Sequence, residues 1–296
     1  MARLRVSEKR GVGGLYGGGM KGYNGFDTGW KGPSMRTRGF TLIELLVVIA
    51  IIGLLLAIMI PALQKGKDYA QRLVCATHLR GFGLANTLYV EANKGWYVPI
   101  MDWRDPDPAR WEYWPSNELF RELLGLKDAQ GQKETWHAPK KFLCPSDTIS
   151  KREVKDVSWD SYLSYAGNIT DWYASVGWPN IKYAGHKEVT LPSPGTKMAF
   201  GESNDWWMWW PGANYEKGWD VLHQDTITPY KNVGCDGPTL YRHSEGANVT
   251  FYDGHVEYLK KEKIFVKEDW DATPKRPGMW TAYSGYPPDA SKLVSP

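Results

Sequence analysis

The sequence predicts an α+β protein in which one long N-terminal helix precedes a β-rich globular domain. An apolar run from Phe40 to Ile60, followed by apolar residues at helical spacing, indicates the helix. After residue 95 the pattern changes to short apolar runs separated by Pro and Gly, and 15 of the 16 Trp follow the apolar run. We therefore expect four parts, at residues 1–39, 40–61, 62–94 and 95–296.

The apolar run is long enough to span a membrane. The 21 residues from Phe40 to Ile60 would form a helix about 31 Å long at ~1.5 Å per residue, which matches the hydrocarbon core of a bilayer. A secretory signal peptide has an apolar region of only about 7–15 residues and a small-residue cleavage site, and neither is present. The core helix of a soluble protein is the alternative, which the length of the run disfavours.

The basic charge is concentrated ahead of this run. Residues 1–39 carry eight Lys and Arg against two acidic residues, while the whole chain has a formal net charge of only +3. The even balance of the remainder argues against a nucleic-acid partner. Because positively charged flanks stay in the cytoplasm, we expect the N-terminus inside and residues 62–296 outside, which in a bacterium is an oxidising compartment.

The residues before the run are rich in glycine and lack apolar periodicity, so they cannot bury a core. Gly17 to Gly22 formally match G-x-G-x-x-G, but no strand precedes them and no helical pattern follows, so the dinucleotide-binding interpretation fails. The sequence leaves open whether translation starts at Met1, Met20 or Met35.

From residue 62 to 94 the pattern predicts an amphipathic continuation of the helix. Apolar residues recur at steps of three and four. Gly66, Gly81 and Gly83 predict local softening, and Asn93-Lys94-Gly95 should end the helix. The residues assigned to the apolar stripe are Leu63, Ala70, Leu73, Val74, Thr77, Leu84, Ala85, Leu88 and Tyr89.

Near the C-terminus, Asp253-Gly254 predicts a β-hairpin with a two-residue turn. This turn pairs Tyr252 with His255 and sets Phe251 opposite Val256. The simplest role for His243 is then a structural hydrogen bond where the strand begins. An alternative is a Ca²⁺ or other metal site, the one cofactor considered, built from Asp253, His243 and Glu202, although His is a poor Ca²⁺ ligand.

The three cysteines form no C-x-x-C pair, so a zinc-finger-like site is not expected. A disulfide between Cys75 and Cys144 would join the helix to the globular domain across a loop of about 70 residues, worth ~4 kcal/mol in the chain-entropy model. The alternative is two buried thiols that pack as small apolar groups. Cys235 is expected to be alone.

The segment "NDWWMWWPGANYEKGW" concentrates Trp residues. On a strand, Trp207 and Trp209 would share one face, and Met208 and Trp210 the other. One face would enter the core. The other face could be exposed and contact a polysaccharide or another subunit, because exposed aromatic residues mark binding surfaces.

Gly39-Phe40-Thr41-Leu42-Ile43-Glu44 closely resembles the processing site of type IV prepilins and type II secretion pseudopilins. The basic leader and the Pro61 that closes the first helical segment belong to the same pattern. Three further segments resemble large pseudopilin-like proteins, with His243, nine residues and Asp253-Gly254 as the H-x9-DG segment. These segments are "RLVCATHLRGFGLA", "FLCPSD" and "RHSEGANVTFYDGHVEYL".

The resemblance implies a pilin-like fold and a structural role. Prepilin peptidase would cleave between Gly39 and Phe40 and the new Phe40 amine would be methylated. The helix would then assemble with copies of itself or with other pilin-like subunits into a type II secretion or type IV pilus-like filament. It further implies a single-pass inner-membrane protein with a periplasmic domain, or a filament or surface location after assembly.

Glu44 is the residue that this interpretation must explain, because a lone carboxylate inside a membrane helix is costly. We expect the methylated Phe40 amine of a neighbouring subunit to pair with it during assembly. The competing function is a membrane-tethered glycan-binding module that does not polymerise. An enzyme is disfavoured, because no nucleophile motif or suitably spaced pair of carboxylates is found.

Overall fold

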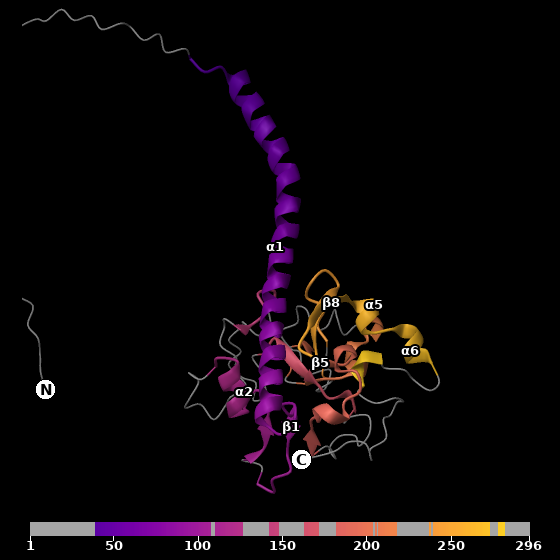
Figure 1. Cartoon of the computed structure of the whole chain (residues 1–296). Helices are drawn as coiled ribbons and strands as arrows, with labels where there is room; N and C mark the ends of the chain where they lie inside the picture. Colours follow the sequence, from indigo (N-terminus) through magenta and orange to yellow (C-terminus); the bar gives the residue numbers. More distant parts are fainter. Residues whose placement is uncertain are drawn as a thin grey trace, which may run out of the picture. The chain divides into compact units, whose positions relative to one another are not determined.

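A computed structural model gives the structure of the chain (Figure 1). Residues 1–38 of the expected leader, which was assigned to 1–39, and Cys235 lie outside the residues that it describes. The described residues are 39–107, 110–126, 142–147, 163–171, 182–203, 205, 207–217, 237, 239–272 and 278–281. The chain divides into two compact units, the first ending at Leu54 and the second starting at Leu55.

The long helix, α1, runs from Leu42 to Ala92. It ends where the sequence predicts, because Lys94 and Gly95 adopt φ values of 56° and 82°, and the Gly95 N–H caps the Val90 carbonyl at 3.0 Å. Pro61 lies inside α1, and the helix continues through it, as the continuation predicted for residues 62–94 requires.

The buried face of α1 differs from the predicted stripe. Its buried residues begin at Cys75 and follow steps of three and four, at Cys75, Leu79, Phe82, Gly83, Ala85, Asn86, Tyr89 and Val90. Of the predicted stripe only Ala85 and Tyr89 are buried. The large apolar side chains of the stripe that stay exposed are Leu63, Leu73, Val74, Leu84 and Leu88.

The second unit contains a five-stranded sheet in the order β6-β3-β5-β7-β8 and a three-stranded sheet in the order β2-β1-β4. All neighbouring strands are antiparallel except β3 and β6, which are parallel. The strands are β1 (Met101–Asp102), β2 (Glu112–Tyr113), β3 (Tyr165–Asn168), β4 (Tyr183–Ala184), β5 (Met198–Glu202), β6 (Trp207–Met208), β7 (Gly246–Phe251) and β8 (Val256–Lys260). Short helices are α2 (Glu118–Leu123), α5 (Lys261–Ile264) and α6 (Lys267–Asp271). The α+β class is therefore confirmed.

Hydrophobic side chains cover both faces of the five-stranded sheet. On one face Phe82 of α1 packs against Tyr165 and Phe200, at ring distances of 5.5 and 5.4 Å. On the other face Met198 and Val249 belong to a second cluster that includes residues of α5 and Trp280. In Figure 1, β5 and β8 lie beside the C-terminal part of α1.

The β7–β8 hairpin forms at the predicted place, but with a register that differs by one residue. Thr250 pairs with Val256, whereas a two-residue turn required Phe251 there. The Phe251 carbonyl accepts from the Gly254 N–H at 2.9 Å, and Gly254 has a φ of 88°. Tyr252-Asp253-Gly254 is thus a three-residue loop with Gly in the left-handed position, which shifts the pairing.

The hairpin turn lies directly on α1. A Cβ placed on Gly83 would come within 2.5 Å of the Gly254 carbonyl oxygen. Along the same strand, the Thr250 hydroxyl donates to the Leu79 carbonyl at 3.1 Å, and the Asn248 side chain to the Arg72 carbonyl at 3.3 Å. β7 and the helix therefore run side by side in a fixed register.

Candidate functional site

The first candidate site is the N-terminal stretch of α1. Every large apolar side chain from Phe40 to Leu63 is exposed. In the described part of the chain, α1 is one helix whose length and composition suit a membrane span, with a mean hydropathy of 3.1 over its most apolar window. An apolar surface of this extent is stable only when lipid or protein covers it.

Glu44 lies in the first turn of α1 and has local partners. Its carboxylate accepts from the Thr41 N–H and from the Thr41 hydroxyl, both at 2.8 Å, and the Glu44 N–H donates to the Thr41 hydroxyl at 3.3 Å. This reciprocal arrangement of Thr-x-x-Glu is a capping box. The carboxylate therefore satisfies a free backbone N–H at the start of the helix, a role that the sequence analysis missed although the motif is visible there.

Trp207 and Trp209 share one face of the sheet, as the alternation predicts. Their rings lie 6.4 Å apart, while Met208 and Trp210 belong to the cluster on the opposite face. Trp207 is only 4% exposed, because both faces of the sheet are covered. It cannot offer its ring to a sugar in this structure, so the expected exposed aromatic face is wrong for Trp207.

The three residues considered for a Ca²⁺ site do not come together. His243 Nε2 lies 3.3 Å from Glu202 Oε2, and both side chains are buried. Asp253 instead lies in the exposed hairpin turn and contacts His255. The six residues of β7, roughly 20 Å of extended chain at 3.3 Å per residue, separate it from His243.

His243 instead lies close to Cys75 and Cys144. Cys144 Sγ lies 3.5 Å from His243 Nε2, and the ligand atoms of Cys75, Cys144 and His243 all lie within 4.8 Å of one another in a fully buried cluster. Both cysteines are free thiols in this structure. Their proximity agrees with the pairing that the sequence suggested, and the disulfide itself stays a prediction.

Glu202 completes this cluster from the end of β5. Its Oε1 accepts from the Asn248 N–H at 3.0 Å and from the Asn248 side chain at 2.7 Å. Its Oε2, which faces His243, is buried and receives no hydrogen bond. We refer to Cys75, Cys144, Glu202 and His243 as the thiol–imidazole cluster.

Contacts within the thiol–imidazole cluster shift the pKa values of its own side chains. Burial opposes charge on Cys144, but its contacts with Cys75 and His243 overcome this and lower the pKa of its thiol to about 6. Burial would likewise lower the pKa of His243, whereas Cys144 and Glu202 raise it to about 9. The hydrogen bond with Cys144, reinforced by burial, raises the pKa of Cys75. The arrangement favours a Cys144 thiolate beside a His243 imidazolium.

A second buried ion pair lies next to the cluster. The Arg242 guanidinium donates to Asp147 Oδ2 at 3.0 Å and to the Ser164 carbonyl at 2.9 Å. The Ser164 hydroxyl donates to Asp147 at 2.6 Å and accepts from the Cys144 N–H at 2.9 Å. The pair thereby holds the "CPSD" turn in place. The sequence offered only the position of Asp147 in that segment and of Arg242 beside His243.

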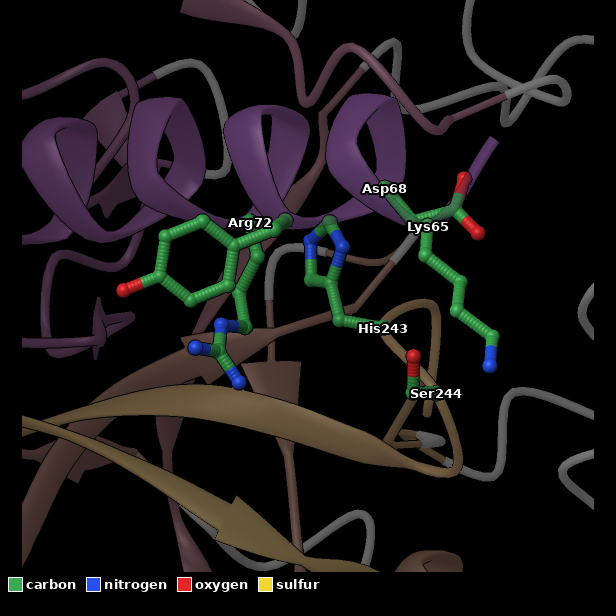
Figure 2. Close-up of a pocket in the computed structure, with 6 residues that line it drawn as sticks. Lys65, Asp68, Arg72, His243 and Ser244 are labelled. Carbon is green, nitrogen blue, oxygen red and sulfur yellow. The ribbon is translucent and has the colours of Figure 1, made fainter. Parts of the chain in front are cut away.

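A surface hollow of about 310 Å³ leads to His243. Its lining comes from α1 and from the turn that precedes β7, namely Lys65, Asp68, Tyr69, Arg72, His243 and Ser244. Figure 2 shows the imidazole of His243 directed toward the helix, with Lys65 and Asp68 beyond it. His243 thus connects the buried cluster with this surface.

The match to a known family lies at the N-terminal end. Residues 34–60 match the family described as the prokaryotic N-terminal methylation motif. The type II secretion system core protein G of Klebsiella michiganensis is 33% identical to the chain over 93 residues. The match covers 29% of this chain and 64% of that relative, a little under two thirds of the relative's length. No solved structure was found to match the chain.

Proposed function

We propose that the chain is a pilin-like protein with a prepilin-type N-terminus, and that it serves as a pseudopilin subunit of a type II secretion or type IV pilus-like filament. In this proposal prepilin peptidase cleaves between Gly39 and Phe40, and the new Phe40 amine is methylated. The family is structural, and the chain acts as the substrate of the peptidase rather than as an enzyme.

One observation carries the proposal. The methylation motif at residues 34–60 coincides with a helical segment whose large apolar side chains are all exposed. A bilayer would cover this surface first, and the helices of neighbouring subunits would cover it after assembly. The exposed apolar side chains Leu73, Val74, Leu84 and Leu88 extend the same kind of surface along the exported part of α1.

The basic residues ahead of the span support an orientation with the N-terminus in the cytoplasm. The globular domain would then lie in the periplasm of a single-pass inner-membrane protein before assembly. The alternative of a glycan-binding module loses support, because Trp207, one of the two rings on which it rested, is buried, while Trp209 is half-buried.

Mass spectrometry of the mature N-terminus tests the proposal. The full chain is expressed in cells with and without prepilin peptidase, and its N-terminal peptide is sequenced. We expect N-methyl-Phe40 in the first strain and an intact leader in the second, and an intact leader for Gly39→Leu in both. An unprocessed chain in cells that process another prepilin would refute the proposal.

A further inference from the structure

We propose that the thiol–imidazole cluster, with both thiols reduced, is a tetrahedral site for a transition-metal ion of the zinc class. Three of its donors, Cys75 Sγ, Cys144 Sγ and a ring nitrogen of His243, lie within 4.8 Å of one another. Glu202 Oε2, which lies 3.3 Å from His243 Nε2, is the candidate for the fourth position. The four side chains come from α1, the "CPSD" turn, the turn before β7 and the end of β5. This inference is independent of the proposed assembly function.

The distances suit a tetrahedral ion. With zinc bond lengths of about 2.3 Å to sulfur and about 2.0–2.1 Å to nitrogen and oxygen, adjacent ligands lie about 3.6 Å apart for a sulfur–nitrogen pair and about 3.4 Å for a nitrogen–oxygen pair. Cys144 Sγ to His243 Nε2 is 3.5 Å, and His243 Nε2 to Glu202 Oε2 is 3.3 Å. These two of the six ligand–ligand distances therefore have the length that a bound ion requires.

The buried carboxylate of Glu202 is an independent observation that points to a cation. Glu202 is 0% exposed, and its Oε2 makes no hydrogen bond but faces His243 Nε2 at 3.3 Å, which is a charge pair only while the imidazole is protonated. A bound cation would take over this pairing with the buried carboxylate. Asn248 holds the other oxygen through two hydrogen bonds, which fixes the carboxylate so that Oε2 stays directed at the cluster.

The donor types select the class of metal. Thiolates and imidazole bind zinc, copper and similar ions well, whereas Ca²⁺ and Mg²⁺ prefer oxygen ligands. Two sulfur donors and one imidazole nitrogen within 4.8 Å of one another, with a carboxylate oxygen beside the nitrogen, are a donor set typical of zinc. Arg242, whose buried guanidinium lies near Cys144 and Glu202, offsets part of the negative charge that two thiolates and a carboxylate bring.

His243 links the cluster to the surface. It forms part of the wall of the hollow of about 310 Å³, whose lining carries the carboxylate of Asp68 together with the cations Lys65 and Arg72. Figure 2 shows the His243 side chain directed toward α1.

Metal titration of the full chain tests the site. The chain is purified in detergent, reduced with a phosphine under nitrogen, stripped with chelator and titrated with Zn²⁺, and bound metal is counted after desalting. A parallel titration uses Co²⁺, whose absorption spectrum reports thiolate ligands and tetrahedral geometry. We expect about one ion per chain, thiolate-to-cobalt bands, and at least about tenfold weaker binding for Cys144→Ser, His243→Gln and Glu202→Gln.

Two matched controls should keep full binding. Cys235→Ser removes the third cysteine, and His186→Gln removes another buried histidine that lies 3.4 Å from a carboxylate, Asp171. If a ligand variant fails to fold, the Co²⁺ spectrum of the unsubstituted chain still decides. The proposal is overturned by a reduced chain that takes up no metal, by a spectrum without thiolate bands, or by binding that survives the three ligand substitutions. Re-formation of a Cys75–Cys144 disulfide in place of metal uptake would overturn it as well.

Discussion

Glu44 shows how one carboxylate can serve two purposes at the start of a membrane helix. In the isolated chain it accepts from the N–H and hydroxyl groups of Thr41, which lowers the cost of placing it next to the apolar segment. In the proposed filament it would also pair with the Phe40 amine of a neighbour. The first role depends on hydrogen bonding and the second on charge, so substitutions can separate them.

We therefore expect different results from two substitutions at Glu44. Glu44→Ala should insert in the membrane but lose site-specific crosslinks between subunits. Glu44→Gln can still cap Thr41, yet it lacks the charge, so it should also fail to assemble. Crosslinking yield in membranes from cells with an active assembly system is the measurement. Normal crosslinking by Glu44→Gln would show that capping alone is required and would remove the charge-pairing hypothesis.

His243 and Asp253 illustrate what the sequence could not provide at this scale. Their fixed spacing suggested a shared site, but the strand between them carries them to opposite ends of the hairpin. The actual partners of His243 are distant in sequence, with Cys144 lying 99 residues away. Periodicity and motif spacing report neighbours along an element, whereas this cluster depends on the packing of four separate segments.

At the scale of elements, local sequence signals predicted where α1 ends but not which face of α1 is buried. Asn93-Lys94-Gly95 ended α1 as expected, because residues in the left-handed region stop a helix whatever surrounds them. The buried stripe was misassigned, because Leu73 and Leu84 are exposed while Cys75 and Asn86 are buried. In a chain whose helix has apolar residues on several sides, composition alone does not say which side meets the sheet.

The contact between α1 and the hairpin turn predicts opposite effects for two neighbouring glycines. Gly83→Ala should lower the free energy of unfolding by about 1–3 kcal/mol, because its Cβ would overlap the backbone of Gly254. Gly81→Ala meets nothing within 4 Å, so it should stabilise the helix by up to about 1 kcal/mol. Denaturant unfolding of the full chain in detergent, followed by Trp fluorescence, measures both. Equal effects at the two positions would contradict the close contact.

At the scale of the whole molecule, aromatic side chains dominate the interior of the globular domain. Burial raises the pKa of several phenols, and for Tyr97, where Glu188 and Asp253 add to the effect, the pKa rises to about 12. The others with a raised pKa in the core or beside it are Tyr89, Tyr113, Tyr165, Tyr183 and Tyr215. The folded domain therefore holds these protons more tightly than the unfolded chain, whose phenols titrate near pH 10.

This difference predicts that the domain loses stability in base. Between pH 10 and 12 the folded state binds more protons, so the free energy of unfolding falls as the pH rises. Tyr97 alone contributes up to about 3 kcal/mol of this loss, at about 1.4 kcal/mol per pKa unit. Unfolding midpoints at pH 9 and 11 measure the effect. Tyr97→Phe keeps the ring but has no proton to lose, so its midpoint should fall less; an unchanged pH dependence would contradict the assignment.

The contacts of β7 with α1 have a consequence for chain length. The strand touches the helix at Arg72 through Asn248, at Leu79 through Thr250, and at Gly83 through Gly254. On the helix, the first and last of these contacts are eleven residues apart, about 16 Å at ~1.5 Å per residue. On the other side, the chain runs along β7 from Asn248 to Phe251 and then turns at Tyr252-Asp253-Gly254. The contacts with α1 thus fix the number of residues that can lie between His243 and Asp253. An insertion or deletion in this segment would break the contact with α1 at one of its ends. The length of the segment is therefore a structural requirement, even where single side chains in it can be exchanged.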